Sequence, residues 1–157
     1  MSANLTGTTS VGSTISVCSA APATFDAAGY EALTFTKVGE VKSIPKFGIS
    51  RSSITFTPLE TGVAQKRPGP SDPGKLALEM SLNTDNAGQI LLKTGLASNG
   101  PFSFKVQTQN ADVYYFQAIV LSFTPNIGDA SSWTTATCEL DITSSNTGVS
   151  IVEVLAT

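Results

Sequence analysis

The 157-residue sequence has nine Lys or Arg, twelve Asp or Glu, a net charge of −3 and no histidine. The missing histidine excludes a Ser-His-Asp triad, a Cys-His pair and imidazole metal ligands, and the acidic balance argues against a nucleic-acid binder. Charged residues make up only 13% of the chain, whereas 39 of its 157 residues are Ser or Thr. This composition indicates a weakly charged surface that is not suited to remain exposed to water on its own.

Apolar and polar residues alternate with period two along most of the chain, which is typical of half-buried strands. We expect about eight strands, at residues 14–19, 33–38 with a continuation at 40–44, 53–57, 75–82, 102–106, 113–124, 133–143 and 149–155. The spacing at residues 84–97 instead predicts one helix, capped by Thr84 or Asp85. Its two internal glycines require it to pack on a sheet. The predicted fold is mainly β: a sandwich or barrel of two packed antiparallel sheets with one flanking α-helix.

Two cysteines, Cys18 and Cys138, lie in predicted strands. One disulfide between them is possible. Free thiols are favoured because the sequence shows no export signal and because buried free cysteine is a common small apolar residue.

The stretch from Leu59 to Gly74 breaks the alternation and is rich in Gly and Pro. We expect a long loop at residues 59–74 without secondary structure, within a single domain at residues 1–157. Such a loop is either a mobile insertion or an arm that becomes ordered on a partner, and its prolines favour the arm. Residues 1–12 are polar and show no strand pattern, so they predict either a second arm or a frayed terminus.

Charge is unevenly distributed. All nine basic residues lie between Lys37 and Lys105, whereas the chain from residue 106 onward has five acidic residues and no basic one. Glu139 and Asp141 share a strand face, but general acid–base catalysis would need a cleft and separated pKa values. We therefore expect no enzyme activity, no metal site and no cofactor.

The segment from Pro22 to Gly48 carries the most specific pattern in the chain. It contains Pro22-Ala23-Thr24-Phe25-Asp26-Ala27-Ala28-Gly29-Tyr30, then Val38-Gly39-Glu40-Val41 and a Phe47-Gly48 pair. This resembles the N-terminal signature of major tail tube proteins of long-tailed bacteriophages, whose fold is shared by type VI secretion tubes. Looser similarity continues at Asp85-x-x-Gly88-Gln89 and at Tyr115-Phe116-x-Ala118.

The resemblance implies a structural virion protein that forms hexameric rings. The rings would stack into a tail tube that encloses a tape measure protein and conducts the genome. It also implies a tail terminator and distal tail or baseplate proteins as partners, assembly in the host cytoplasm, and DNA passage without sequence-specific binding. We expect no membrane anchor.

Two sets of residues are candidates for this role. The candidates for contacts between rings or subunits lie in the long loop: Leu59, Gly62, Lys66, Arg67, Pro68, Pro70 and Asp72. The candidates for an acidic lumen, which would repel DNA phosphates, lie in the last third of the chain: Asp112, Asp129, Glu139, Asp141 and Glu153. The alternative function is a carbohydrate- or protein-binding β-sandwich of a virion, for which exposed Tyr30, Phe47 or Trp133 would be the expected contact residues.

Overall fold

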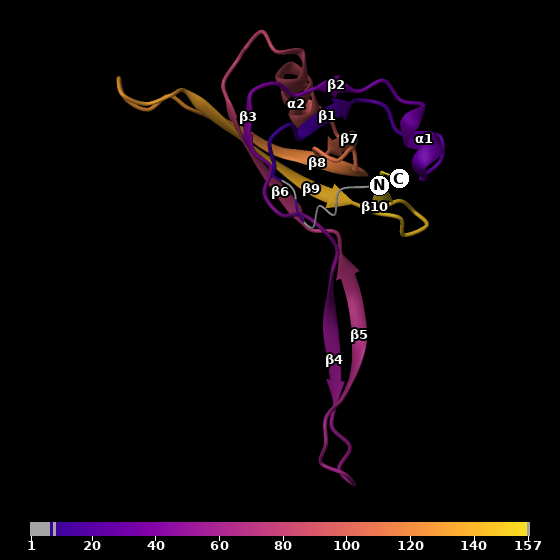
Figure 1. The fold of residues 1–157 in the computed structure, drawn as a ribbon. Coiled ribbons are helices and arrows are strands. Elements are labelled where there is room, and N and C mark those ends of the chain that lie inside the picture. Colours follow the sequence, from indigo (N-terminus) through magenta and orange to yellow (C-terminus); the bar gives the residue numbers. More distant parts are fainter. Residues whose placement is uncertain (1–6, 8, 157) are drawn as a thin grey trace.

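A curled antiparallel sheet, with a two-stranded hairpin projecting from it, dominates the computed structural model (Figure 1). The structure describes residue 7 and residues 9–156; most of the predicted N-terminal arm at residues 1–12 therefore lies outside the described residues. The predicted mainly β, antiparallel fold class with a flanking helix is confirmed. No helix among the described residues is long and apolar enough to cross a membrane.

Eight strands form the large sheet. Their order is β2-β1-β7-β8-β9-β6-β3, and β10 pairs with the first part of β8. The strands are β1 Thr14–Cys18, β2 Thr36–Lys37, β3 Val41–Ser43, β6 Lys75–Ser81, β7 Phe102–Gln107, β8 Val113–Asn126, β9 Thr135–Thr143 and β10 Ile151–Val154. The strand expected at residues 33–38 is reduced to two residues, because Leu33 still donates its backbone N–H to the carbonyl oxygen of Tyr30 in the preceding helix.

The core lies on the concave face of this sheet, where the apolar members of each alternating strand point inward. These residues include Ile15, Val17, Leu76, Leu78, Met80, Phe102, Phe104, Val106, Phe116, Ala118, Val120, Cys138, Leu140 and Ile142. Cys18 and Cys138 are both buried free thiols, as predicted. Burial, reinforced by the neighbouring Glu139 carboxylate, raises the pKa of Cys138 to about 12.

Helix α2, Ala87–Ala97, packs on the sheet as its glycines predicted. A Cβ on Gly88 would overlap the backbone of Lys37 and Val38, and one on Gly95 would press on Val120 and Phe102. The helix begins later than expected. Asn86, not Thr84 or Asp85, is the N-cap, and its side-chain oxygen accepts the backbone N–H of Gln89.

The buried side chain of Gln89 connects three segments of the chain. Its Oε1 accepts the backbone N–H of Asn83 at 3.0 Å, and its Nε2 donates to the carbonyl oxygens of Ser81 at 2.8 Å and Gly39 at 3.3 Å. Asn86 Oδ1 also accepts the N–H of Gly39. The Val38-Gly39-Glu40-Val41 pattern thus forms a corner between β2 and β3 that the start of α2 holds in place.

A short helix, α1 (Ala27–Glu31), was not predicted. Asp26 caps it by accepting the backbone N–H of Gly29 at 2.8 Å and the Thr24 hydroxyl at 2.7 Å, which together lower the pKa of Asp26. A Cβ on Gly29 would overlap the Thr24 carbonyl. Tyr30 is buried and its ring stacks on Tyr115 at 5.3 Å. The Pro22–Tyr30 signature therefore docks a helical turn on β8.

The prediction that residues 59–74 lack secondary structure is wrong. Residues Gln65–Asp72 form strand β5, which pairs with β4, Ser50–Phe56, in an antiparallel hairpin. Prolines are tolerated there because both strands of a two-stranded sheet are edges. The register shifts between Arg51 and Ser53, opposite Gly69, so a bulge accommodates the Gly-Pro pair.

Candidate assembly surfaces

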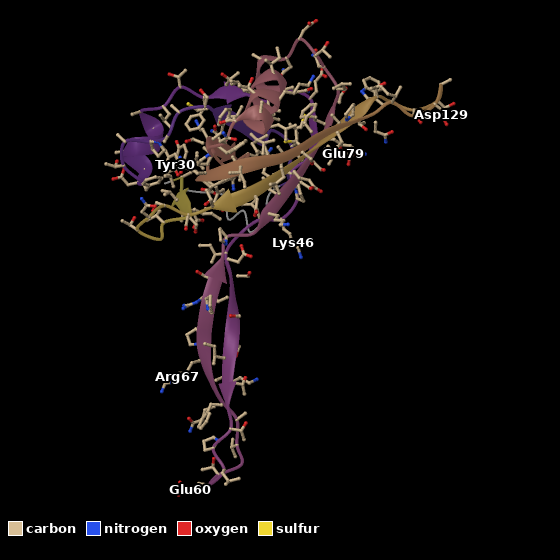
Figure 2. The ribbon with its side chains drawn as sticks, turned by 180° about the vertical axis from the view of Figure 1, so that it is seen from behind. Tyr30, Lys46, Glu60, Arg67, Glu79 and Asp129 are labelled. Atoms are coloured by element: carbon tan, nitrogen blue, oxygen red, sulfur yellow. The ribbon has the colours of Figure 1, made fainter. Side chains whose placement is uncertain are left out.

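The β4–β5 hairpin is the most exposed element of the chain. Every residue of β4 is exposed, and so is every residue of β5 except Gly69. Its side chains project into solvent from both sides of the ribbon (Figure 2). The turn at its tip is ordered by the backbone N–H of Gly62, which donates to the carbonyl oxygen of Pro58 at 2.9 Å.

The two faces of the hairpin differ in chemistry. Register partners point to the same face, so the Ile54↔Arg67 and Phe56↔Gln65 pairs define one face. Ile54 and Phe56 are 58% and 66% exposed. The opposite face carries the Ser53↔Pro68 and Thr55↔Lys66 pairs. We call the face with Ile54, Phe56 and Arg67 the apolar face of the hairpin.

The structure brings the seven predicted contact residues together on this one hairpin. Leu59, fully exposed, and Gly62 lie at its tip. The other five lie on β5: Lys66, Arg67, Pro68, Pro70 and Asp72. Ile54 and Phe56 are not among the predicted contact residues, although their alternation within residues 53–57 predicts a strand. Alternation within a strand predicts one buried face, whereas both faces of this strand are exposed.

The five acidic candidates do not share one surface. Glu139 and Asp141 lie together on the outward face of β9, opposite the buried Cys138 and Leu140. Across the strand pairs, Asp141 neighbours Lys75 and Ile119.

The other three carboxylates lie at opposite ends of the sheet. Asp129 is in the β8–β9 connection (Figure 2). Hydrogen bonds from the Ser132 hydroxyl and the Ser131 N–H lower the pKa of its carboxyl group. Asp112 and Glu153 lie near Tyr114, whose pKa is raised mainly by burial and then by their charges. The described residues contain no cluster of three His, Cys, Asp or Glu that could hold a metal ion.

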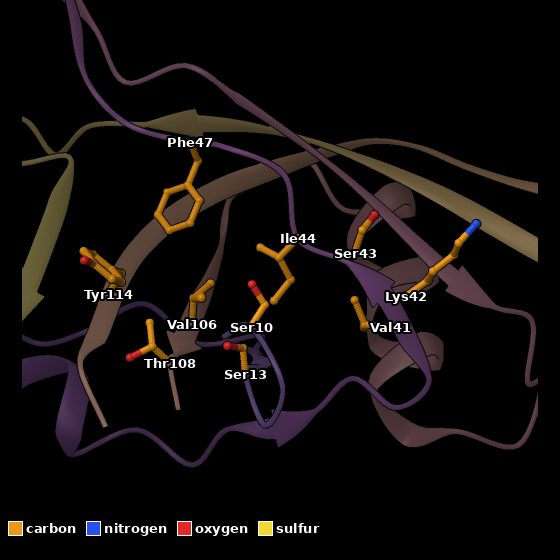
Figure 3. Close-up of a pocket in the computed structure, with 10 residues that line it drawn as sticks. All are labelled: Ser10, Ser13, Val41, Lys42, Ser43, Ile44, Phe47, Val106, Thr108 and Tyr114. Atoms are coloured by element: carbon orange, nitrogen blue, oxygen red, sulfur yellow. The ribbon is translucent and has the colours of Figure 1, made fainter. Parts of the chain in front are cut away.

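Two adjoining hollows lie beside the residues that lead into the hairpin. The first, of about 500 Å³, lies between β3 and the ends of β1, β7 and β8 (Figure 3). Phe47 forms one wall and packs edge-on against Tyr114 at 5.6 Å. Thr108 Oγ1 is buried there without a hydrogen-bond partner.

The second hollow, of about 460 Å³, shares Ile44, Phe47 and Tyr114 with the first. It opens at the base of the hairpin, and we call it the root groove. The residues that matter for its chemistry are Ile44, Lys46, Phe47, Ile49, Ile151 and Glu153.

The aromatic residues do not form a shared binding surface. Tyr30 is buried and Phe47 is partly buried against the core. Trp133 is 77% exposed, and its indole N–H donates to the Ser81 hydroxyl. Only Trp133 of the three aromatic residues expected for a carbohydrate-binding surface is exposed, which argues against that alternative function.

No protein-family model and no curated protein sequence matches this chain. Solved structures do match. A chain in the sheath/tube terminator structure of PVC, an extracellular contractile injection system, aligns with a TM-score of 0.69 at 13% identity, covering 97% of this chain and 99% of that chain. The chain has a tail-tube-like fold.

Two further matches come from other assemblies. A chain in the baseplate structure of the anti-feeding prophage aligns with a TM-score of 0.65 at 12% identity, covering 87% of this chain and 91% of that chain. A chain in the virion of a gene transfer agent aligns with a TM-score of 0.60 at 9% identity, covering 76% and 88%. At these identities the likeness establishes the tail-tube-like fold, and function has to be argued from the surfaces.

Proposed function

We propose that the chain is a structural subunit of a phage-type tail or injection apparatus, where it forms hexameric rings that stack into a tube for genome delivery. The observation that carries this proposal is the hairpin: an ordered arm whose apolar residues have no partner within the described chain. Exposed apolar surface of this kind marks a protein interaction site. The tail-tube-like fold indicates that the partner is another subunit.

Two more features support an assembled subunit. The large sheet is open at the two ends of its strand order, where β2 and β3 present unpaired backbone groups that a neighbouring subunit can meet. The outward face of β9 carries Glu139 and Asp141. We assign such carboxylates, among the five candidates, to a lumen whose negative potential lets DNA slide. The tape measure protein, tail terminator and baseplate proteins are the proposed partners, and the virion is the proposed location.

The test is electron microscopy of the purified chain beside a variant that lacks the arm. In the variant, residues 54–67 are replaced by a two-residue Asn-Gly turn that joins the register partners Ser53 and Pro68. We expect the parent to form rings and tubes of uniform diameter, and the variant to keep its fold without forming tubes. A parent chain that stays monomeric at every concentration would contradict the proposal, as would normal tubes from the shortened variant.

A further inference from the structure

The hairpin's apolar face is bounded by two charges of opposite sign. Arg67 lies on β5 directly across from Ile54, and Glu60 lies in the turn at the tip (Figure 2). Among the described residues the one salt bridge joins Lys42 and Glu79. Neither Arg67 nor Glu60 therefore forms an ion pair within the described chain. The hairpin therefore presents an apolar strip with a cation toward its middle and an anion at its end.

The root groove has the complementary chemistry. Its walls include Ile44, Phe47 and Ile151, while Lys46 and Glu153 supply one charge of each sign. These two charges also lack an ion-pair partner among the residues that the structure describes. Both surfaces are thus apolar and carry one cation and one anion, so each charge of the hairpin can meet an opposite charge in the groove.

A chain cannot fill its own root groove with its own hairpin. The groove lies where the hairpin begins, and the hairpin extends straight away from it (Figures 1 and 2). Lys46 and Glu60 are separated by fourteen residues in the sequence, so up to about 46 Å of extended chain lies between them. The occupant has to come from another molecule.

We propose that the hairpin of one copy docks in the root groove of the next copy, with Arg67 beside Glu153 and Glu60 beside Lys46. This inference rests on the proposed function, because it names the receiving surface for the arm. Apolar burial by Ile54, Phe56 and Leu59 supplies the attraction. The exposed ion pairs add little affinity and set the direction in which the hairpin lies.

Head-to-tail contact of this kind has a geometric consequence. A contact between two different surfaces of one chain repeats from copy to copy; it forms a closed ring when the rotation between copies closes and an open-ended stack when it does not. Each copy is displaced from the next along the hairpin direction by no more than the distance from groove to tip, about 46 Å.

The test uses charge reversal in the full chain. Arg67→Glu and Glu153→Arg should each raise the concentration needed for tube formation by about 2- to 30-fold, which corresponds to twice the strength of an exposed ion pair. The double variant should return to within about twofold of the parent. Lys66→Glu is the matched control: it makes the same charge change on the opposite face of the hairpin and should have the smaller effect. Urea unfolding of each variant checks that it stays folded.

The outcomes separate the docking inference from the proposed function. Docking in the root groove is supported if tube formation returns when Arg67→Glu is combined with Glu153→Arg. It is also supported if tube formation returns when Lys46→Glu is combined with Glu60→Lys. If Lys66→Glu and Arg67→Glu impair assembly equally and neither double variant restores it, the docking is overturned, while tubes from the parent still uphold the proposed function. If the parent itself forms no rings or tubes, the proposed function fails and the docking inference fails with it.

Discussion

Replacing Ile54 and Phe56 by threonine should remove the hairpin's assembly energy without disturbing the subunit. Threonine retains a preference for β-strands, so β4 should persist. The two side chains are 58% and 66% exposed. Full burial of such side chains contributes about 1.5–3 kcal/mol each, so burial of the exposed part in an interface contributes roughly 1–2 kcal/mol each.

The double variant should therefore weaken each contact by roughly 2–4 kcal/mol, or roughly 30- to 700-fold in binding constant. Sedimentation velocity across a concentration series measures the shift, and urea unfolding should show an unchanged subunit. Ile127→Ser is the matched control, since Ile127 is 66% exposed but lies in the β8–β9 connection. The reasoning would be refuted if the double variant formed tubes at the same concentration as the parent chain. It would also be refuted if Ile127→Ser weakened assembly as much as the double variant does.

Three predictions concern the fold. Gln89→Leu should destabilise the subunit by about 3 kcal/mol in urea unfolding, because three part-buried backbone groups lose their partner at about 1 kcal/mol each. The exposed control Gln109→Leu should change stability by less than about 0.5 kcal/mol, and equal effects would contradict the role of Gln89. Gly29→Ala should cost about 1–3 kcal/mol because the new methyl group meets the Thr24 carbonyl, and a neutral result in the same assay would show that α1 adjusts freely. The raised pKa of Cys138, about 12, predicts that its thiol resists a thiol reagent in the native protein up to pH 10 and reacts at once in urea; rapid native labelling at Cys138 would contradict its burial.

The sequence predicts the large sheet best where a strand has one buried face. In β6 and β9, alternation of apolar and polar residues maps directly onto buried and exposed positions. Strand β7 and the first part of β8 are instead buried on both faces, at Phe102–Phe104 and Tyr115–Ala118, so alternation alone does not account for their prediction. Local periodicity suffices wherever the core lies on one side.

Periodicity fails where no core dictates the pattern. Strand β5 contains Pro68 and Pro70 and has no buried face, so its sequence resembles a loop and only pairing with β4 makes it a strand. Helix α1 is missed because five residues with Gly29 at the centre have little helical propensity. Its stability comes from the Asp26 cap and from Tyr30 packing on β8, which is distant in sequence.

The candidate surfaces show the same division. The seven arm residues could be proposed from the sequence because a Gly- and Pro-rich stretch stands out locally. The root groove could not be found, because it is assembled from residues near Phe47, from Tyr114 on β8 and from Ile151 on β10. Their proximity depends on the pairing of β10 with β8, and no local pattern in a single sequence specifies that pairing.

In the proposed assembly, the placement of the arm also makes ring closure and stacking separable. The hairpin projects away from the large sheet (Figure 1), whereas β2 and β3, at the ends of the strand order, are lateral edges for a neighbour in the proposed ring. Disabling the apolar face of the hairpin should therefore leave ring formation intact and stop stacking. Electron microscopy of the Ile54→Thr/Phe56→Thr variant should show single rings. If that variant yields only monomers, the hairpin must also hold neighbours within one ring, because loss of an axial contact alone does not open a closed ring.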